Sequence, residues 1–245
     1  MNGLKDPQQF RKIIADYHLS PAAKDALGAI TLVILVAPTS AGRNTIIKRL
    51  VKSGKYYFIV SDTTREPRIN DGVLEENGVT YWFRSEAEVL NDLKDGKYLE
   101  AELIHNQQVS GISIRELLKA KQHNKIAITD VDIGGVHNIV KAKNDAIAIL
   151  VLPPSFEEWQ RRFFGRGKMN DIEINRRLQT ALNIYSHAKT NKDLTFLIND
   201  DIDESAQKIK NIVDSGQSDS QEQARARILI DDLEKNTINF LKNFH

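Results

Sequence analysis

The chain is 245 residues long, with 41% hydrophobic and 27% charged residues, which is the composition of a globular protein. Its 34 lysines and arginines balance 33 aspartates and glutamates to a formal net charge of +1, which argues against a general nucleic-acid-binding protein. With 0 cysteines, disulfides, a thiolate nucleophile and cysteine-ligated metals are excluded. Because the start lacks a secretion signal and the longest apolar run, residues 29–37, is too short to cross a bilayer, we expect a soluble cytoplasmic protein with no membrane partner.

Residues 1–29 are predicted to form a helical extension with two short helices. Asp6 and Ser20 are N-cap residues, and each precedes a proline suited to the first helical turn. After the first of these signals, apolar residues fall on one helical face: Phe10, Ile13, Ile14 and Tyr17. We expect the extension to pack against the rest of the chain.

From residue 30 the sequence alternates buried strands with helices. The run Thr31–Val36 is rich in β-branched residues and leucine, which is typical of a strand covered on both faces. Similar strands are predicted at Ile126–Val131, Ile147–Leu152 and Thr195–Ile198. The pattern predicts an α/β fold with a mainly parallel sheet and flanking helices in one core domain, residues 30–214.

Two stretches interrupt this alternation. Residues 61–113 contain short alternating strands and a helix that starts at Ser85, with Glu88 in the capping-box position, so we expect a small β-rich insert. Residues 164–177 are rich in arginine and glycine between two helices, which predicts a mobile helical lid.

Residues 215–245 are predicted to form a polar linker and an amphipathic helix. The helix carries an apolar stripe made of Ile230, Leu233, Ile238, Leu241 and Phe244. We favour packing of this stripe within the same chain. Pairing with the N-terminal helices, or with a second subunit in a homodimer, is the alternative.

The turn after the first strand has the setting of a phosphate-binding loop without its consensus sequence. The P-loop motif is Gly-x-x-x-x-Gly-Lys-Ser/Thr between a strand and a helix, where backbone N–H groups converge on phosphate. Here Gly42 keeps its place, but Ala37, Arg43 and Asn44 replace the first glycine, the lysine and the magnesium-binding hydroxyl. Arg43 keeps a permanent charge, and Asn44 can offer Mg²⁺ an oxygen, through water. An ordinary strand-to-helix turn is the alternative.

The most informative segment is Ser61–Arg68, with the sequence Ser-Asp-Thr-Thr-Arg-Glu-Pro-Arg. Arg65 and Arg68 can converge on one anion, since the intervening proline stiffens the turn. Together with the phosphate turn and later arginines, this segment resembles the acceptor site of the guanylate kinase family, Ser-x-Thr-Thr-Arg-x-Pro-Arg. The resemblance extends from about residue 30 to 213, and implies a P-loop nucleoside monophosphate kinase fold and ATP-dependent phosphorylation of GMP to GDP.

The resemblance implies a GMP site in the β-rich insert. Ser61, Arg65, Arg68 and Tyr81 would hold the GMP phosphate. Glu100 would recognise guanine, because one carboxylate can accept from N1–H and the 2-amino group together, which adenine cannot match. Asp132, in the segment Asp-Val-Asp-Ile-Gly-Gly, would help to orient the acceptor.

The resemblance also implies an ATP site with Mg²⁺ as cofactor. The transferring phosphoryl group would be neutralised by Arg43, Arg162, Arg166 and Arg177, since this chemistry needs charge more than it needs an acid or a base. Asp130 and Asn44 would assist the metal, both through water. The predicted ATP-binding residues are Ala37, Pro38, Thr39, Ser40, Ala41, Gly42, Arg43, Asn44, Thr45 and Asn199.

Three regions depart from the family pattern, and Gly134 replaces the glutamine that the family has after its second aspartate. The phosphate turn has changed as described, and the loop between Arg68 and Tyr81 is longer. Residues 106–113 stand where the family has Gly-Asn-Tyr-Tyr-Gly-Thr/Ser. Val109 or Ser110 occupies the position of the family's phosphate-contacting tyrosine, and Ile112 or Ser113 occupies the position of its base-contacting hydroxyl. Two alternatives therefore stay open: a catalytically silent guanylate-kinase-like binding module, and a phosphotransferase acting on another nucleotide-like acceptor.

Overall fold

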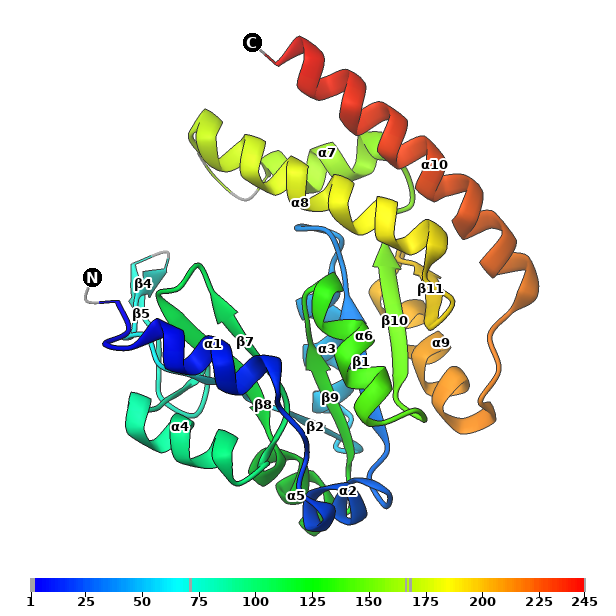
Figure 1. The fold of residues 1–245 in the computed structure, drawn as a ribbon. Helices are drawn as coiled ribbons and strands as arrows, with labels where there is room; N and C mark the ends of the chain where they lie inside the picture. Colours follow the sequence, from blue (N-terminus) through cyan, green and yellow to red (C-terminus); the bar gives the residue numbers. More distant parts are fainter. Residues whose placement is uncertain (1–2, 71, 166, 168, 245) are drawn as a thin grey trace. The chain divides into compact units, whose positions relative to one another are not determined.

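A computed structural model describes residues 3–70, 72–165, 167 and 169–244 (Figure 1). The chain divides into two compact units, each of which combines segments that are far apart in the sequence. Unit 1 comprises Met1–Leu32, Tyr56–Thr129 and Asn138–Asp145, and unit 2 comprises Val33–Lys55, Asp130–His137 and Ala146–His245. Among the described residues, no helix combines the length and the apolar character that a membrane span requires.

The central sheet confirms the predicted α/β fold. Its strands follow the spatial order β11-β10-β1-β9-β2, and the pairs β1–β10, β10–β11 and β2–β9 are parallel. The core strands β1 and β10 are buried along nearly their whole length, because their apolar runs are covered on both faces. The five strands are β1 (Leu32–Val36), β2 (Tyr56–Phe58), β9 (Ile126–Asp130), β10 (Ile147–Leu152) and β11 (Leu194–Ile198).

The helices around the sheet begin where the sequence offers caps. Ser155 caps α7, and Asn170 caps α8, each by accepting a backbone N–H of the first turn. These helices are α3 (Arg43–Lys52), α6 (Ile133–Ala142), α7 (Phe156–Phe164), α8 (Asp171–Thr190), α9 (Ile202–Ser215) and α10 (Ser220–Asn243).

The C-terminal helix α10 packs within its own chain, with Ile230 and Leu233 of the predicted stripe buried and Ile238 exposed. It runs beside α8 and contacts β11 and α7 (Figure 1). Gln223 accepts a hydrogen bond from Phe196 N and donates one to Phe196 O, both at 2.8 Å, so its side chain occupies the edge of β11 as a neighbouring strand would. The ring of Phe240 packs at a tilted angle against Phe156 and Phe164 of α7, with ring centres 6.3 and 6.0 Å away. A homodimer through this helix stays a prediction.

Unit 1 contains the predicted β-rich insert. A second sheet has the order β6-β3-β8-β7, and the capping box at Ser85 and Glu88 forms at the start of α4 as predicted. The longer loop after Arg68 folds into a hairpin of β4 and β5. The strands are β3 (Asp62–Thr63), β4 (Ile69–Asn70), β5 (Val73–Leu74), β6 (Trp82–Phe83), β7 (Tyr98–Ile104) and β8 (Gln108–Ser113), and the helices are α1 (Pro7–Ala15), α2 (Pro21–Leu27), α4 (Glu86–Lys94) and α5 (Ile114–Gln122).

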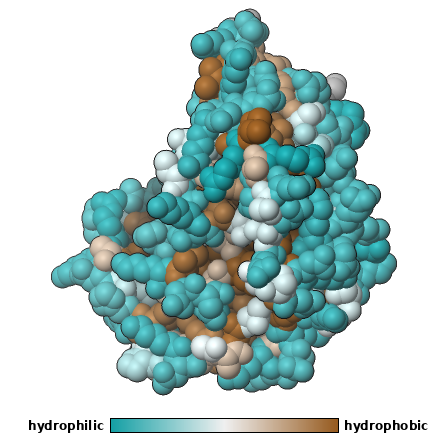
Figure 2. Space-filling view, turned by 90° about the vertical axis from the view of Figure 1, so that its right-hand side faces the viewer, coloured by the Kyte–Doolittle hydropathy of each residue, from teal (hydrophilic) through white to brown (hydrophobic). Residues whose placement is uncertain are grey.

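The N-terminal extension is part of the core of unit 1. Phe10 of α1 is 2% exposed and packs in a cluster with Leu93, Tyr98 and Val109. The Tyr17 hydroxyl donates to Tyr98 O at 2.6 Å and accepts from Tyr98 N at 2.7 Å, which closes the edge of β7. Hydrophilic side chains cover most of the face that Figure 2 shows, and apolar side chains gather in smaller patches between them.

Candidate functional site

The phosphate turn in unit 2 connects β1 to α3 through residues 37–42. Ser40 and Gly42 adopt left-handed conformations, with φ of 68° and 97°. A Cβ built on Gly42 would lie 2.1 Å from Asn199 Nδ2, so the turn admits only glycine at this position without moving. The glycine that the sequence retains is therefore the one that the geometry requires.

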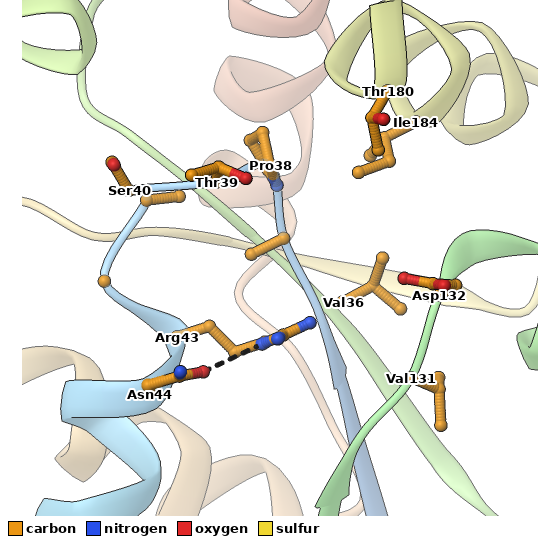
Figure 3. A pocket seen from close by; sticks show the side chains of 13 residues that line it. Val36, Pro38, Thr39, Ser40, Arg43, Asn44, Val131, Asp132, Thr180 and Ile184 are labelled. Atoms are coloured by element: carbon orange, nitrogen blue, oxygen red, sulfur yellow. Dashed lines mark hydrogen bonds between the residues drawn. The ribbon is translucent and has the colours of Figure 1, made fainter. Parts of the chain in front are cut away.

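A cavity of about 160 Å³ lies at this turn (Figure 3). The turn and the first residues of α3 line one side, and Asp132 and the α8 residues Thr180 and Ile184 line the other. The N-terminus of α3 opens on the cavity, where free N–H groups and the helix dipole favour an anion. Ser40 Oγ is buried without a hydrogen-bond partner among the described residues. These features suit the binding of a phosphate group.

Arg43, Asn44 and Asp130 come together at the start of α3. Arg43 Nη2 lies 2.5 Å from Asp130 Oδ2, and Arg43 Nε donates to Asn44 Oδ1 at 3.2 Å. Asp130 at the end of β9 thus holds the arginine that replaces the P-loop lysine. Within the described part of the chain, no group of three acidic or histidine residues is arranged to hold a metal ion.

Two of the predicted lid arginines are held by glutamates on their own helices. On α7, Glu158 pairs with Arg161 and Arg162, and Arg162 Nε lies 2.6 Å from Glu158 Oε1. Hydrogen bonds from Arg161, which has the larger effect, and from Arg162 lower the pKa of Glu158 to about 2. Arg162 also donates to the carbonyl oxygen of Asn199 at 3.0 Å, which ties α7 to the end of β11.

The same arrangement recurs on α8, where Glu173 pairs with Arg176 and Arg177. Hydrogen bonds from Arg176, which has the larger effect, and from Arg177 lower the pKa of Glu173 to about 2. A Glu-x-x-Arg-Arg sequence therefore fixes a pair of guanidinium groups on each of the two helices. The predicted catalytic residue Arg166 lies outside the described residues.

Asn199 supports the phosphate turn from the end of β11. Its side chain is fully buried, and Nδ2 donates to Ala41 O at 2.7 Å while Oδ1 accepts from Ser205 Oγ at 2.9 Å. Both polar atoms of the amide are thus hydrogen-bonded within the protein. Asn199 supports the turn, and its role in ATP binding stays a prediction.

In unit 1, Arg65 lies in the segment predicted to bind an anion, and its side chain is held by Glu75. Its guanidinium forms two hydrogen bonds with Glu75, at 2.5 and 2.8 Å, and lies 4.8 Å from the ring centre of Tyr81. The hydrogen bond with Glu75 is the main cause that raises the pKa of Arg65. Glu75 also accepts from Arg68 N at 2.9 Å, so one buried carboxylate orders both ends of the Arg65–Arg68 turn.

Hydroxyl and amide side chains surround this turn. Arg68 is exposed and donates to Gln108 Oε1 at 3.3 Å, and Gln108 Nε2 lies 3.4 Å from Ser110 Oγ. Ser110 Oγ in turn donates to Thr63 Oγ1 at 3.0 Å. The structure therefore brings the predicted residue Arg68 beside polar groups of β8 that the motif did not include.

The register of β7 and β8 shows which of the candidate residues in 106–113 lie on the same face as Glu100. Ile112 pairs with Glu100, and Ser110 pairs with Glu102. Paired residues on neighbouring strands share a face of the sheet, so Ser110, Ile112 and Glu100 lie on one face. Val109 is 1% exposed in the core cluster, and Ser113 caps α5. Ser110 and Ile112 are therefore the residues on the face of Glu100.

Sequence reasoning missed several residues that order these sites. Glu75 gave no local signal, because it lies ten residues after Arg65, across the long loop. Glu158 and Glu173 do carry a signal, since glutamate three and four residues before arginine on a helix predicts ion pairs. Trp159, whose indole Nε1 donates to Thr39 O in the phosphate turn at 2.7 Å, gave no signal beyond an apolar helix position.

A parallel strand that leads through a glycine-dependent turn into a helix, with a cavity at the helix N-terminus, is the arrangement of P-loop α/β folds. Comparison with known proteins narrows this class. A family model described as guanylate kinase matches residues 29–216. The chain belongs to the guanylate kinase family.

Individual relatives agree with this assignment. Guanylate kinase of Rickettsia prowazekii is 33% identical over 74% of this chain and 89% of its own length. Guanylate kinase 1 of Oryza sativa (31% identical over 66% of this chain) and Guanylate kinase 1 of Arabidopsis thaliana (32% over 74%) are longer, and this chain spans 44% and 46% of them. The crystal structure of guanylate kinase from Anaplasma phagocytophilum shares the fold, with a TM-score of 0.55 and 23% identity over 82% of this chain and 93% of that one.

Proposed function

We propose that the protein transfers the γ-phosphoryl group of ATP to GMP and forms ADP and GDP. A phosphate oxygen of GMP attacks the γ-phosphorus, and the bond between that phosphorus and the β–γ bridging oxygen of ATP breaks. The attacking oxygen is already anionic, so no general base is needed. Family membership over residues 29–216 is the observation that carries the proposal.

The acceptor is assigned to unit 1. Arg65, Arg68, Ser61 and Tyr81 would bind the phosphate of GMP, and the Arg65 guanidinium is already oriented by Glu75. Glu100 would accept from guanine N1–H and the 2-amino group. Since its cross-strand partner Ile112 offers no hydroxyl, selection of the base depends mainly on this one carboxylate.

The donor is assigned to unit 2. The turn amides and the N-terminus of α3 would bind the ATP phosphates, while Arg43, Arg162 and Arg177 would stabilise negative charge as the phosphoryl group moves. The ion pairs with Glu158 and Glu173 hold the guanidinium groups of Arg162 and Arg177 in a defined orientation before ATP binds.

Mg²⁺ is proposed to accompany ATP, and it would neutralise charge on the β- and γ-phosphates. Its ligands are oxygens, mostly from water and phosphate. Asp132, whose carboxylate lines the cavity, and Asn44 suit this role. The carboxylate of Asp130 forms an ion pair with Arg43, so it would contact the metal through water.

Purified protein should be assayed with ATP, Mg²⁺ and a panel of GMP, IMP, AMP and UMP. We expect GMP to be the preferred acceptor and AMP to react at least roughly 100-fold more slowly, because adenine leaves Glu100 without its donors. Phosphorylation of a different nucleotide in preference to GMP would favour the alternative acceptor. GMP binding in a calorimeter without turnover would favour a silent module.

A further inference from the structure

Trp159 connects the helix that carries Arg162 to the phosphate turn. Its side chain is 1% exposed, and its indole Nε1 donates to the carbonyl oxygen of Thr39 at 2.7 Å. We propose that Trp159 is a positioning residue that orients the backbone of the turn for the phosphates of ATP. The inference rests on the proposed function for the identity of the ligand.

The orientation follows from the geometry of the peptide unit. In a planar trans peptide the C=O and the next N–H point in opposite directions. Trp159 holds Thr39 O, and Asn199 Nδ2 holds Ala41 O at 2.7 Å. The N–H groups of Ser40 and Gly42, which follow these carbonyls, therefore point away from the two anchoring side chains. Both residues line the cavity, so their amides are available to an anion there.

Three aromatic rings keep the indole in place. Phe156 and Phe163 of α7 and Tyr185 of α8 meet it at steep interplanar angles, with ring centres 5.9, 5.8 and 6.2 Å away. The position of Nε1 is thus set by the packing of α7 against α8, and Thr39 O cannot rotate into the cavity without losing its partner. A carbonyl oxygen turned toward the cavity would repel phosphate.

The phosphate turn lacks most of the P-loop consensus residues, so the orientation of its backbone is especially important. Ala37 stands where the motif has its first glycine, and the charge of Arg43 is shared with Asp130 at 2.5 Å. Backbone amides must therefore supply much of the attraction for phosphate, and amides attract only when they are correctly aimed. Trp159 and Asn199 each fix one of the two peptide units concerned.

The substitution Trp159→Phe tests the proposal, because phenylalanine keeps an aromatic ring beside Tyr185 but has no N–H. We expect the affinity for ATP, measured by calorimetry without acceptor, to fall about tenfold, as the loss of one hydrogen bond at an ordering position implies. The KM for ATP should rise in parallel, while the KM for GMP stays within about twofold of the parent value, since α7 belongs to unit 2.

The other tryptophan provides a matched control. Trp82 Nε1 is buried without a hydrogen-bond partner among the described residues, so Trp82→Phe removes an indole but no such bond. This variant should bind ATP as the parent does. ATP affinity within about twofold of the parent in Trp159→Phe, or an equal loss in both variants, would overturn the proposal.

A spectroscopic measurement covers the case in which Trp159→Phe fails to fold. In Trp82→Phe protein labelled with ¹⁵N, the remaining indole signal belongs to Trp159. It should shift on saturation with ATP and stay in place with GMP. An indole signal whose chemical shift does not change with ATP, or changes equally with GMP, contradicts the proposal. If the parent binds ATP but makes no GDP, only the proposed function fails; if it binds no ATP, both fail.

Discussion

The two proposed anion sites of the protein use different chemical groups. In unit 1 the proposed acceptor site depends on side chains, with Arg65 and Arg68 ordered by the buried Glu75. In unit 2 the phosphate turn depends on backbone N–H groups, which are the same for every residue except proline. A backbone site can therefore lose its consensus side chains and keep its shape, whereas a side-chain site cannot.

The comparison also explains which residues have changed. The family pattern Ser-x-Thr-Thr-Arg-x-Pro-Arg is complete at residues 61–68, but the turn keeps only Gly42 of its P-loop consensus. A Cβ at Gly42 would meet the side chain of Asn199 at 2.1 Å. A steric requirement therefore explains why the phosphate turn retains Gly42.

The largest effect is expected at the side-chain site. Arg65→Ala should lower kcat/KM for GMP by roughly 1,000-fold, because it removes a charge-assisted phosphate contact and the two hydrogen bonds that Arg65 makes with the buried Glu75. Steady-state kinetics with GMP varied would measure this loss, and the KM for ATP should change little. Glu66→Gln, at the exposed neighbouring position, is the control, and a mild phenotype for Arg65→Ala would remove Arg65 from the acceptor site.

The backbone site should be most sensitive at its glycine. Gly42→Ala combines a φ of 97° with a clash against Asn199, so we expect ATP affinity to fall about 100-fold and stability to fall by about 1–3 kcal/mol. Calorimetric titration and thermal unfolding would check the two effects. Gly28→Ala is a fair comparison, since Gly28 has ordinary helical φ and ψ and a Cβ added there would make only an ordinary contact, 3.5 Å from Asp25 O. Equal behaviour of the two variants would show that the turn tolerates side chains.

Arg43 should matter less than Gly42. Arg43→Ala is expected to lower kcat by roughly 10- to 100-fold with GMP binding intact, because the amides still bind phosphate when the cation is lost. Arg43→Lys should retain part of the activity, since it keeps the charge but not the guanidinium fork that contacts Asp130 and Asn44. Unchanged turnover in Arg43→Ala would exclude the proposed role.

The smallest effect is expected at the lid glutamates. Glu158→Gln should lower kcat severalfold at most, since Arg162 keeps its bond to Asn199 O at 3.0 Å. A pKa of about 2 in the folded protein means that the ionised Glu158 stabilises the fold above its ordinary pKa and loses that contribution as the pH falls toward 2. The stability difference between parent and variant, measured by denaturant titration, should therefore shrink between about pH 4.5 and 2.

Glu157→Gln on the same helix is the control for this pH dependence. A stability difference between parent and Glu158→Gln that stays constant with pH would show that the ion pairs with Arg161 and Arg162 are weak in solution.

Much of the fold follows from local sequence signals. The strand Ile147–Leu152 lies where its apolar run predicts, and the caps at Asp6, Ser20 and Ser85 form as expected. These features depend on residues that are close in sequence. The sequence showed only a longer loop where the β4–β5 hairpin lies. The hairpin was not predicted, because its strands are two residues each and Ile69, Val73 and Leu74 are exposed.

The candidate sites were predictable where a family pattern survives. Arg65 and Arg68 could be assigned from their spacing, but their partner Glu75 lies across an unusually long loop. Trp159 and Thr39 are 120 residues apart, so no local pattern joins them. The choice between Val109 and Ser110 needed the register of β7 and β8, which only the paired strands define.

Phosphorus NMR of ATP, Mg²⁺ and GMP incubated with the purified protein tests the central claim most directly, because it follows donor and acceptor together. The account predicts that ADP and GDP signals grow in equal amounts and that inorganic phosphate stays at the level of the blank. Unchanged spectra at high protein concentration, or ADP that appears with inorganic phosphate instead of GDP, would contradict phosphoryl transfer between the two sites.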